Sequence, residues 1–195
     1  MRVLEEQHQN RCVYCDTPGS ATTIEHYYPK KQFPGLMFEW LNLTLACDAC
    51  QRYKGQPLEF CGAWPLVLDP ANETVEPFLY ISPEDGRMMA ALELQEGELA
   101  YKRATETIGR LRLNERWLPR LRLRVVLELR TALESFRRNP GVETEAGILH
   151  MLSPEQPWGA VAWQLMTTPE GEFISLVEFC REHSEAVKRC VSRTA

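Results

Sequence analysis

Four cysteines and a glutamate–histidine pair are the residues of this chain whose types and spacing best suit chemistry. The cysteines form two C-x-x-C motifs separated by 31 residues, Cys12 with Cys15 and Cys47 with Cys50. The C-x-x-C spacing is short enough for both thiolates to bind one ion, and two such motifs complete the tetrahedral coordination of zinc. We therefore predict one structural zinc site. Because such a site leaves no open coordination position, catalysis has to come from other residues.

A redox-active dithiol is the alternative interpretation of a single C-x-x-C pair. The presence of a second pair argues against it, as does the lack of a βαβ pattern around the first. The chain has seven cysteines, and an odd number favours metal binding in a reducing compartment over disulfides. We interpret the remaining three as small apolar residues: Cys61, Cys180 and Cys190.

Glu25 and His26 lie between the two cysteine pairs, and Asn42 follows them. Hydrolysis of a phosphodiester needs a general base for water and a cation at the scissile phosphate. Histidine exchanges protons near neutral pH, and a carboxylate is a hard oxygen ligand for Mg²⁺. We expect Asn42 to fix the tautomer and angle of the imidazole through its side-chain or backbone carbonyl. A Glu-His dipeptide alone is weak evidence, but its place between two metal-binding pairs strengthens it.

Residues 12–55 resemble the HNH endonuclease module in its zinc-stapled form, which has the ββα-metal fold. The family pattern is C-x-x-C, then D/E-H-x-x-P, then Asn-Leu, then C-x-x-C-[HN]-x-x-K. Here it appears as the two cysteine pairs, the segments 25–29 and 42–43, and the segment 47–54. The resemblance implies that His26 is the general base and that Asn42 supports it. It also implies that Glu25 and Gln51 hold a catalytic divalent ion, Mg²⁺ or Mn²⁺.

Gln51 departs from the family pattern, which has His or Asn at this position. Glutamine offers the same amide oxygen as asparagine, but one methylene further out and with more rotamer entropy to lose. The departure predicts weaker metal affinity or a ligand that acts through water. It also keeps open a second hypothesis, a catalytically weak or inactive zinc-binding adaptor that recruits an ATPase or nucleic acid.

A looser resemblance extends over residues 66–138, to the HNH nucleases encoded with retrons and with Septu-type defence systems. It is carried by the segment 68–70, the Asp85-Gly86 turn, the segments 107–108 and 111–114, and the Arg-rich stretch that follows. This resemblance implies the nuclease subunit of an anti-phage defence system that hydrolyses DNA with a large ABC/SMC-like ATPase as partner. Residues 141–195 hardly take part in it.

Charge is distributed unevenly along a chain whose net charge is −5. Residues 1–55 are neutral, 56–101 carry −8, 102–140 carry +7 and 141–195 carry −4. Beside the proposed site, we predict that Lys30, Arg52 and Lys54 contact phosphates flanking the cut, without reading bases. The basic helix predicted at 116–138 has two interpretations: contact with DNA or an acidic partner, or charge balance with the acidic segment.

The pattern of elements predicts an α+β protein. We expect a zinc-stapled ββα module at residues 1–60, with strands at 22–28 and 40–46 and a helix that ends at Gly55. Residues 61–195 are expected to form an accessory region for DNA or partner binding. Its predicted elements are a strand at 66–70, a hairpin around residues 83–87, and helices at 105–113, 116–138, 160–166 and 173–192. No apolar run suits a membrane span or a signal peptide, so a cytoplasmic protein is expected.

Overall fold

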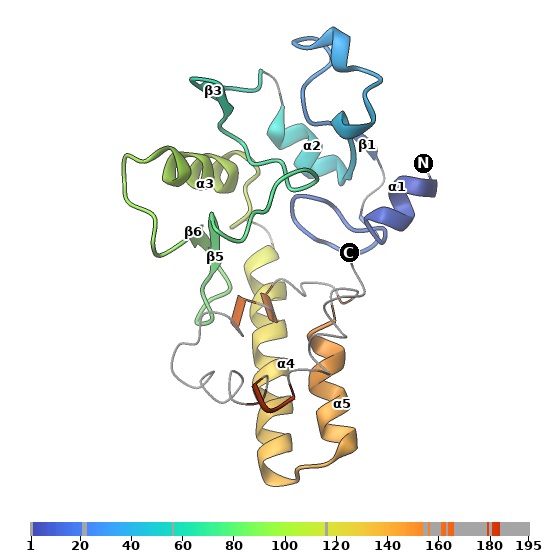
Figure 1. The fold of residues 1–195 in the computed structure, drawn as a ribbon, viewed down its shortest axis with the longest axis vertical. Helices are drawn as coiled ribbons and strands as arrows, with labels where there is room; N and C mark the ends of the chain where they lie inside the picture. The colour runs from blue at the N-terminus through green and yellow to red at the C-terminus, as the bar shows by residue number, and fades with distance from the viewer. Residues whose placement is uncertain are drawn as a thin grey trace. The chain divides into compact units, whose positions relative to one another are not determined.

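The computed structural model describes residues 2–20, 23–55, 57–115 and 117–153, together with 156, 161–162, 164–165, 179 and 181–183. The protein is α+β, as predicted, with small antiparallel hairpins in its first part and long helices later in the chain (Figure 1). Its contacts divide it into two compact units. The first comprises Met1–Ser82 and Arg87–Leu118, and the second comprises Pro83–Gly86 and Pro119–Ala195.

The first unit begins with the predicted ββα arrangement. Helix α1 (Arg2–Gln7) leads into the loop that carries the first cysteine pair. Strands β1 (Thr23–His26) and β2 (Leu43–Ala46) then pair antiparallel, and helix α2 (Asp48–Lys54) follows at once. Strand β1 forms where β-branched residues favour extended backbone, and Leu45 of β2 packs against Leu4 in a small buried core.

The connection between β1 and β2 contains two short 3-10 turns, η1 (Pro34–Leu36) and η2 (Trp40–Asn42). The extended segment predicted at 40–46 is therefore extended only over β2. Helix α2 ends at Gly55, as predicted, and the φ of Gly55 is +56°. Glycine suits this position because it adopts the left-handed region without a steric penalty from Cβ.

The rest of the first unit packs two more hairpins with a helix. The strands are β3 (Phe60–Cys61), β4 (Trp64–Pro65), β5 (Leu79–Ile81) and β6 (Met88–Ala90), and the helix is α3 (Leu99–Arg110). The β5–β6 hairpin confirms the prediction around residues 83–87. The β3–β4 hairpin was not predicted, and the strand predicted at 66–70 is wrong, because the structure has no strand there.

Helix α3 begins six residues earlier than the predicted start at Thr105. The additional residues include Arg103, a charged residue that lies in the interior. Its guanidinium binds both carboxylate oxygens of Glu73, at 2.6 and 2.8 Å, and donates to the carbonyl of Pro65 at 2.8 Å. One basic residue of the +7 segment is thus balanced by Glu73, a residue of the acidic segment 56–101.

The second unit contains most of α4 (Leu118–Arg138) and all of α5 (Val142–Met151). Gly86 packs against the first turn of α4, where a Cβ would lie 2.0 Å from the carbonyl oxygen of Pro119. Its φ is +72°, so both backbone conformation and space favour glycine. The helix α5 was not predicted, and those predicted at 160–166 and 173–192 lie mostly outside the described residues. Within the described part of the chain, no helix has the length and apolar character that crossing a membrane requires.

Candidate functional site

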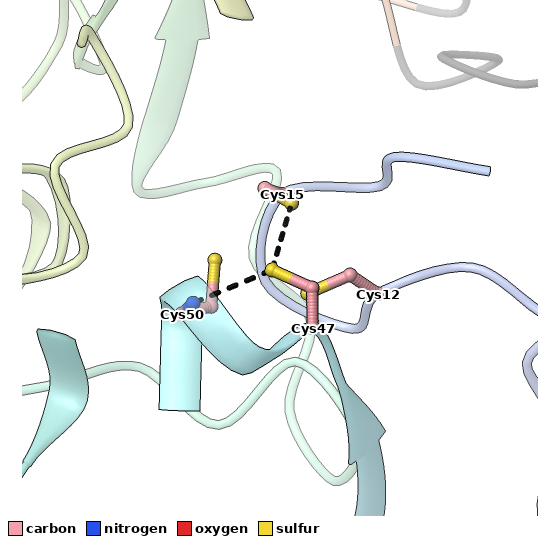
Figure 2. A group of neighbouring side chains, drawn as sticks. All are labelled: Cys12, Cys15, Cys47 and Cys50. Atoms are coloured by element: carbon pink, nitrogen blue, oxygen red, sulfur yellow. Dashed lines mark hydrogen bonds between the residues drawn. The ribbon is translucent and has the colours of Figure 1, made fainter. Parts of the chain in front are cut away.

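The four predicted zinc ligands converge in one buried cluster (Figure 2). Their Sγ atoms all lie within 4.8 Å of one another, and those of Cys15 and Cys47 are 3.9 Å apart. Four sulfurs at about 2.3 Å from a tetrahedral zinc ion would be separated by about 3.8 Å. The donor set and its dimensions therefore fit zinc, and the cluster is the predicted four-cysteine zinc site.

Local structure explains how the second cysteine pair reaches this cluster. Cys47 is the N-cap of α2, and its Sγ accepts a hydrogen bond of 3.3 Å from the backbone N–H of Cys50. Such bonds stabilise the thiolate over the thiol. Within the cluster, the hydrogen bond with Cys12 lowers the pKa of Cys15 to about 7. Several thiolates held so close together repel one another, and a divalent cation removes that repulsion.

The hairpin places the glutamate and the histidine in different surroundings. In the β1–β2 register, Glu25 lies opposite Thr44 and His26 lies opposite Leu43. Because successive side chains of a strand point to opposite faces, the two neighbours separate. Glu25 is buried, whereas His26 is only half-buried, and both residues border one pocket.

A backbone carbonyl holds the imidazole of His26. Its Nε2 lies 3.0 Å from the carbonyl oxygen of Met37 in the β1–β2 connection. Since a carbonyl oxygen can only accept, Nε2 carries the proton in the neutral ring and Nδ1 is left as the basic nitrogen. Sequence reasoning missed Met37, because a backbone carbonyl is present at every residue and has no sequence signature.

Asn42 is placed beside the histidine's loop but does not contact the imidazole. Its side-chain oxygen accepts from the N–H of Tyr28 at 2.6 Å, and its nitrogen donates to the carbonyls of Tyr28 and Leu36 at 3.1 and 2.9 Å. Its own backbone carbonyl accepts from Tyr27 at 3.0 Å. The predicted direct contact with the imidazole is therefore replaced by an indirect one, since Leu36 immediately precedes Met37.

The buried carboxylate of Glu25 forms an ion pair with Lys54, the last residue of α2. The same ammonium donates a hydrogen bond of 2.8 Å to the backbone carbonyl of His26. Burial lowers the pKa of Lys54, and the attraction of Glu25 opposes this shift. Lys54 was predicted to contact phosphates flanking the cut, but the structure places it in the interior, where it forms an ion pair with Glu25.

The second predicted metal ligand, Gln51, borders the same pocket as Glu25. Its side-chain nitrogen donates to the carbonyl of Ile24 at 3.1 Å, which leaves its amide oxygen for a cation. The pocket has a volume of about 170 Å³ and is lined by Ile24, Glu25, His26, Pro29, Lys30, Gln51, Lys54 and Gly55. A carboxylate and an amide oxygen beside one pocket fit a hard divalent ion such as Mg²⁺.

The other basic residues predicted to bind nucleic acid lie at the surface. Lys30 is exposed at the edge of the pocket. Arg52 is also exposed, and its guanidinium forms an ion pair with Asp48 one turn earlier in α2. Such exposed pairs contribute little to stability, so Arg52 can exchange this partner for a phosphate at little cost.

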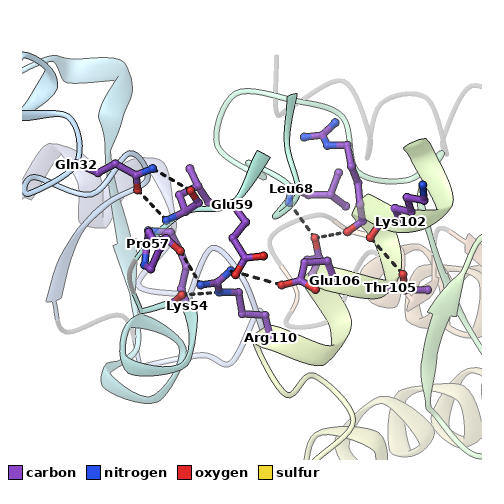
Figure 3. A network of polar contacts seen from close by, with 12 residues as sticks. Gln32, Lys54, Pro57, Glu59, Leu68, Lys102, Thr105, Glu106 and Arg110 are labelled. Carbon is purple, nitrogen blue, oxygen red and sulfur yellow. Dashed lines mark hydrogen bonds and ion pairs between the residues drawn. The ribbon is translucent and has the colours of Figure 1, made fainter. Parts of the chain in front are cut away.

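Helix α3 contacts the end of α2 through Arg110, at the centre of the polar network in Figure 3. Its guanidinium donates to the backbone carbonyls of Lys54 at 2.8 Å and Pro57 at 2.6 Å, and lies 3.3 Å from the carboxylate of Glu59. The last carbonyls of a helix have no partner within that helix, and a cation there also suits the helix dipole. Sequence reasoning did not single out Arg110, which lies 56 residues after Lys54.

The HNH class has this architecture: a β-hairpin followed by a helix, with a four-cysteine zinc site and a Glu-His pair at the edge of a pocket. The comparison with protein families agrees, since residues 12–56 match the model described as HNH endonuclease. This stretch is thus an HNH endonuclease domain.

Among curated proteins, a distant homologue is the Septu protein PtuB of Bacillus thuringiensis, which is 38% identical over 56 residues. The match covers 27% of this chain and 22% of that relative, so the chain spans about a fifth of the relative's length. No solved structure matches the chain.

Proposed function

We propose that this protein is a metal-dependent endonuclease that hydrolyses DNA phosphodiester bonds. The observation that carries the proposal is the hydrogen bond of 3.0 Å between Nε2 of His26 and the carbonyl of Met37. It fixes the tautomer in which Nδ1 is basic, at the edge of a pocket that also holds Glu25 and Gln51. A base, two oxygen donors and a cavity are the parts that water activation at a phosphodiester requires.

In the proposed mechanism, Nδ1 of His26 takes a proton from the attacking water, while Met37 keeps the ring oriented. Glu25 and Gln51 would hold a catalytic Mg²⁺ or Mn²⁺, which would supply positive charge to stabilise the phosphate and the leaving oxygen. Lys30 and Arg52 contact flanking phosphates, and Lys54 forms an ion pair with Glu25. The zinc site has no part in the chemistry, because four thiolates leave it without an open position.

The test compares His26→Ala with the wild type on supercoiled plasmid DNA in Mg²⁺ and in Mn²⁺. We expect the substitution to abolish cleavage and to leave zinc content and the unfolding midpoint unchanged. The matched control is His150→Ala, an exposed histidine on α5. Cleavage by His26→Ala at the wild-type rate would refute the assignment.

The match to a Septu protein supports a further part of the proposal, the cellular role. We propose that the chain is the nuclease subunit of an anti-phage defence system and works with an ABC/SMC-like ATPase. Co-purification of a tagged chain with the product of a neighbouring ATPase gene tests this. A stable 1:1 or higher complex supports it, and separation of the two proteins on a sizing column would contradict it.

One observation favours a second candidate, the non-catalytic zinc-binding adaptor. Glutamine replaces the family's His or Asn at position 51, so the amide oxygen lies one methylene further from the backbone than that of asparagine. Gln51→Asn separates the two functions. A large gain of cleavage identifies a nuclease weakened at its metal ligand, whereas no cleavage in either form supports the adaptor.

A further inference from the structure

We propose that the β1–β2 connection, residues 27–42, is a base-stacking subsite for a nucleic-acid strand that has unpaired bases beside the cut. The inference deepens the proposed nuclease function and rests on it. It names the form of the substrate, a single strand, loop or junction in place of a continuous duplex. The subsite is built from two exposed aromatic residues, Phe38 and Trp40, next to the residue that orients the general base.

The first observation is the exposure of large apolar side chains in this connection. Phe38 is 86% exposed, Trp40 is 51% exposed and Leu41 is 75% exposed. Single exposed apolar residues are ordinary, but three within four positions form a feature that needs a partner. None of the three belongs to the buried core, so packing within the described residues does not explain them.

The second observation is the position of these side chains relative to the chemistry. Phe38 directly follows Met37, whose carbonyl holds the imidazole of His26, and consecutive Cα atoms are about 3.8 Å apart. Trp40 follows two residues after Phe38. In the proposed subsite, nucleotides that neighbour the scissile phosphate therefore contact Phe38 and Trp40. A protein partner covering this surface would block the substrate, so the nucleic acid itself is the occupant that the geometry favours.

The third observation is that the backbone displaying these residues is held at several points. Asn42 donates to the carbonyl of Leu36, and Asn72 donates to the carbonyl of Leu41 at 2.8 Å. Gln32 exchanges two hydrogen bonds with the backbone of Leu58, at 2.9 and 2.8 Å. A fixed backbone lowers the entropy lost when a ligand binds, which suits a preformed platform.

Charge favours nucleic acid over a protein surface. Lys30 and Lys31 are exposed at the start of the connection, and Lys30 also borders the pocket. Glu39 is the single acidic residue of the connection, so its net charge is positive. Aromatic faces beside a basic backbone track are the usual elements of single-strand binding.

The aromatic rings imply unpaired bases for a geometric reason. In a continuous duplex the base faces are stacked on one another, and only their edges are accessible in the grooves. An aromatic ring can stack on a base only where the strand is single, looped or opened. The expected contribution of one such contact is a factor of about 5 to 150 in affinity, which corresponds to about 1–3 kcal/mol.

The test measures binding of the zinc-loaded full chain, in a His26→Ala background, to a labelled single strand and to the duplex of the same sequence. We expect Trp40→Leu and Phe38→Leu each to weaken single-strand binding by a factor of about 5 to 150, with little effect on the duplex. Trp40→Tyr should retain most of the affinity, because it keeps an aromatic face. The matched control is Trp117→Leu, since Trp117 is exposed to a similar degree, 53%, outside the connection. Comparing the affinities for DNA and RNA versions of the single strand shows whether the subsite prefers a strand with deoxyribose or with ribose.

Three results would overturn the inference: unchanged single-strand affinity in both leucine variants, an equal loss for Trp117→Leu, or an equal loss for strand and duplex. Self-association of the wild type that Trp40→Leu abolishes, with unchanged nucleic-acid binding, would assign the surface to a protein contact instead. The nuclease proposal and the subsite proposal can be refuted independently of each other. If the single strand binds through Trp40 but no substrate is cut, the subsite stands and the function falls. If Trp40→Leu cuts single strands with the wild-type KM, the subsite falls alone.

Discussion

The guanidinium of Arg110 donates a hydrogen bond of 2.8 Å to the backbone carbonyl of Lys54, and so joins helix α3 to the last residue of the HNH helix α2. The side chain of the same Lys54 forms the ion pair with Glu25 beside the pocket. The part of the chain beyond residue 60 therefore contacts an element that carries the proposed active site. The boundary predicted at residue 60 stays a prediction, and we propose that the nuclease unit extends through α3.

We predict that Arg110→Met lowers the free energy of unfolding by about 1–3 kcal/mol, because the carbonyls of Lys54 and Pro57 lose their donor. Urea unfolding measures the change. Arg124→Met is the control, since Arg124 is an exposed residue of α4 whose partner is Glu128. In a companion experiment, a fragment of residues 1–60 should bind zinc but unfold at lower urea than a fragment of residues 1–118. Equal midpoints would support the boundary at residue 60.

The buried ion pair of Glu25 and Lys54 predicts a non-additive effect on stability. Removing one partner leaves the other charge buried and unpaired, which costs about 3–5 kcal/mol. We expect Lys54→Met to destabilise by about that amount, and the double variant with Glu25→Gln to recover a large part of the loss. Thermal unfolding without added Mg²⁺ provides the comparison. A double variant as unstable as the sum of the two single variants would show that the pair is not coupled.

The position of Asn42 predicts a loss of activity with a distinctive origin. Asn42→Ala removes the bond to Leu36, so the neighbouring carbonyl of Met37 should no longer hold the imidazole in one orientation. We expect kcat to fall with little change in KM, and the pH profile of kcat to shift because the ring loses its fixed tautomer. The buried partners left unpaired should also cost about 1–3 kcal/mol in stability. A fall in stability with an unchanged pH profile would limit Asn42 to a structural role.

Loss of zinc should reduce activity by unfolding the first part of the chain, because the zinc site takes no part in the chemistry itself. Because metal binding contributes to the folding free energy of such sites, Cys47→Ser should lose stoichiometric zinc and show a lower unfolding midpoint. Metal analysis and circular dichroism measure the two effects. Cys61→Ser is the control, since Cys61 is exposed and lies outside the cluster. Full zinc content in the Cys47→Ser protein would contradict the four-cysteine site.

His8 predicts a pH dependence of stability. Burial lowers the pKa of His8, with a smaller effect from Arg11, and its Nε2 lies 3.1 Å from the hydroxyl of Thr44. In the unfolded chain a histidine binds a proton near pH 6.5, whereas the folded protein binds it only at lower pH. The unfolded state therefore holds more protons below about pH 6.5, and the free energy of unfolding should decrease as the pH falls through that value.

The comparison of the wild type with His8→Gln isolates this effect, since acid-induced zinc loss is common to both proteins. We expect the two stability curves, measured by urea unfolding between about pH 5 and 8, to converge as the pH falls. His150→Gln serves as the control on α5. Parallel curves for the wild type and His8→Gln would remove His8 as the cause.

The sequence alone determined the zinc ligands, the β1 strand and helix α2. Each of these three has a local cause. The C-x-x-C spacing brings two thiolates to one ion, β-branched residues favour a strand, and glycine ends a helix at Gly55. Local signals of this kind survive in a sequence because they depend on residues only a few positions apart.

Only the tertiary structure decided what those residues contact. In the folded protein the carbonyl of Met37 orients the imidazole of His26, and Asn42 binds the neighbouring carbonyl of Leu36 instead of the imidazole itself. Lys54 lies in the interior, where it forms an ion pair with Glu25. The tertiary structure also supplied Arg110 from a helix 56 residues further along the chain. Backbone carbonyls are the same at every position, and the burial of a charge depends on which distant segments pack around it. Residue spacing therefore predicts neither which carbonyl a side chain will contact nor which charged side chain will be buried.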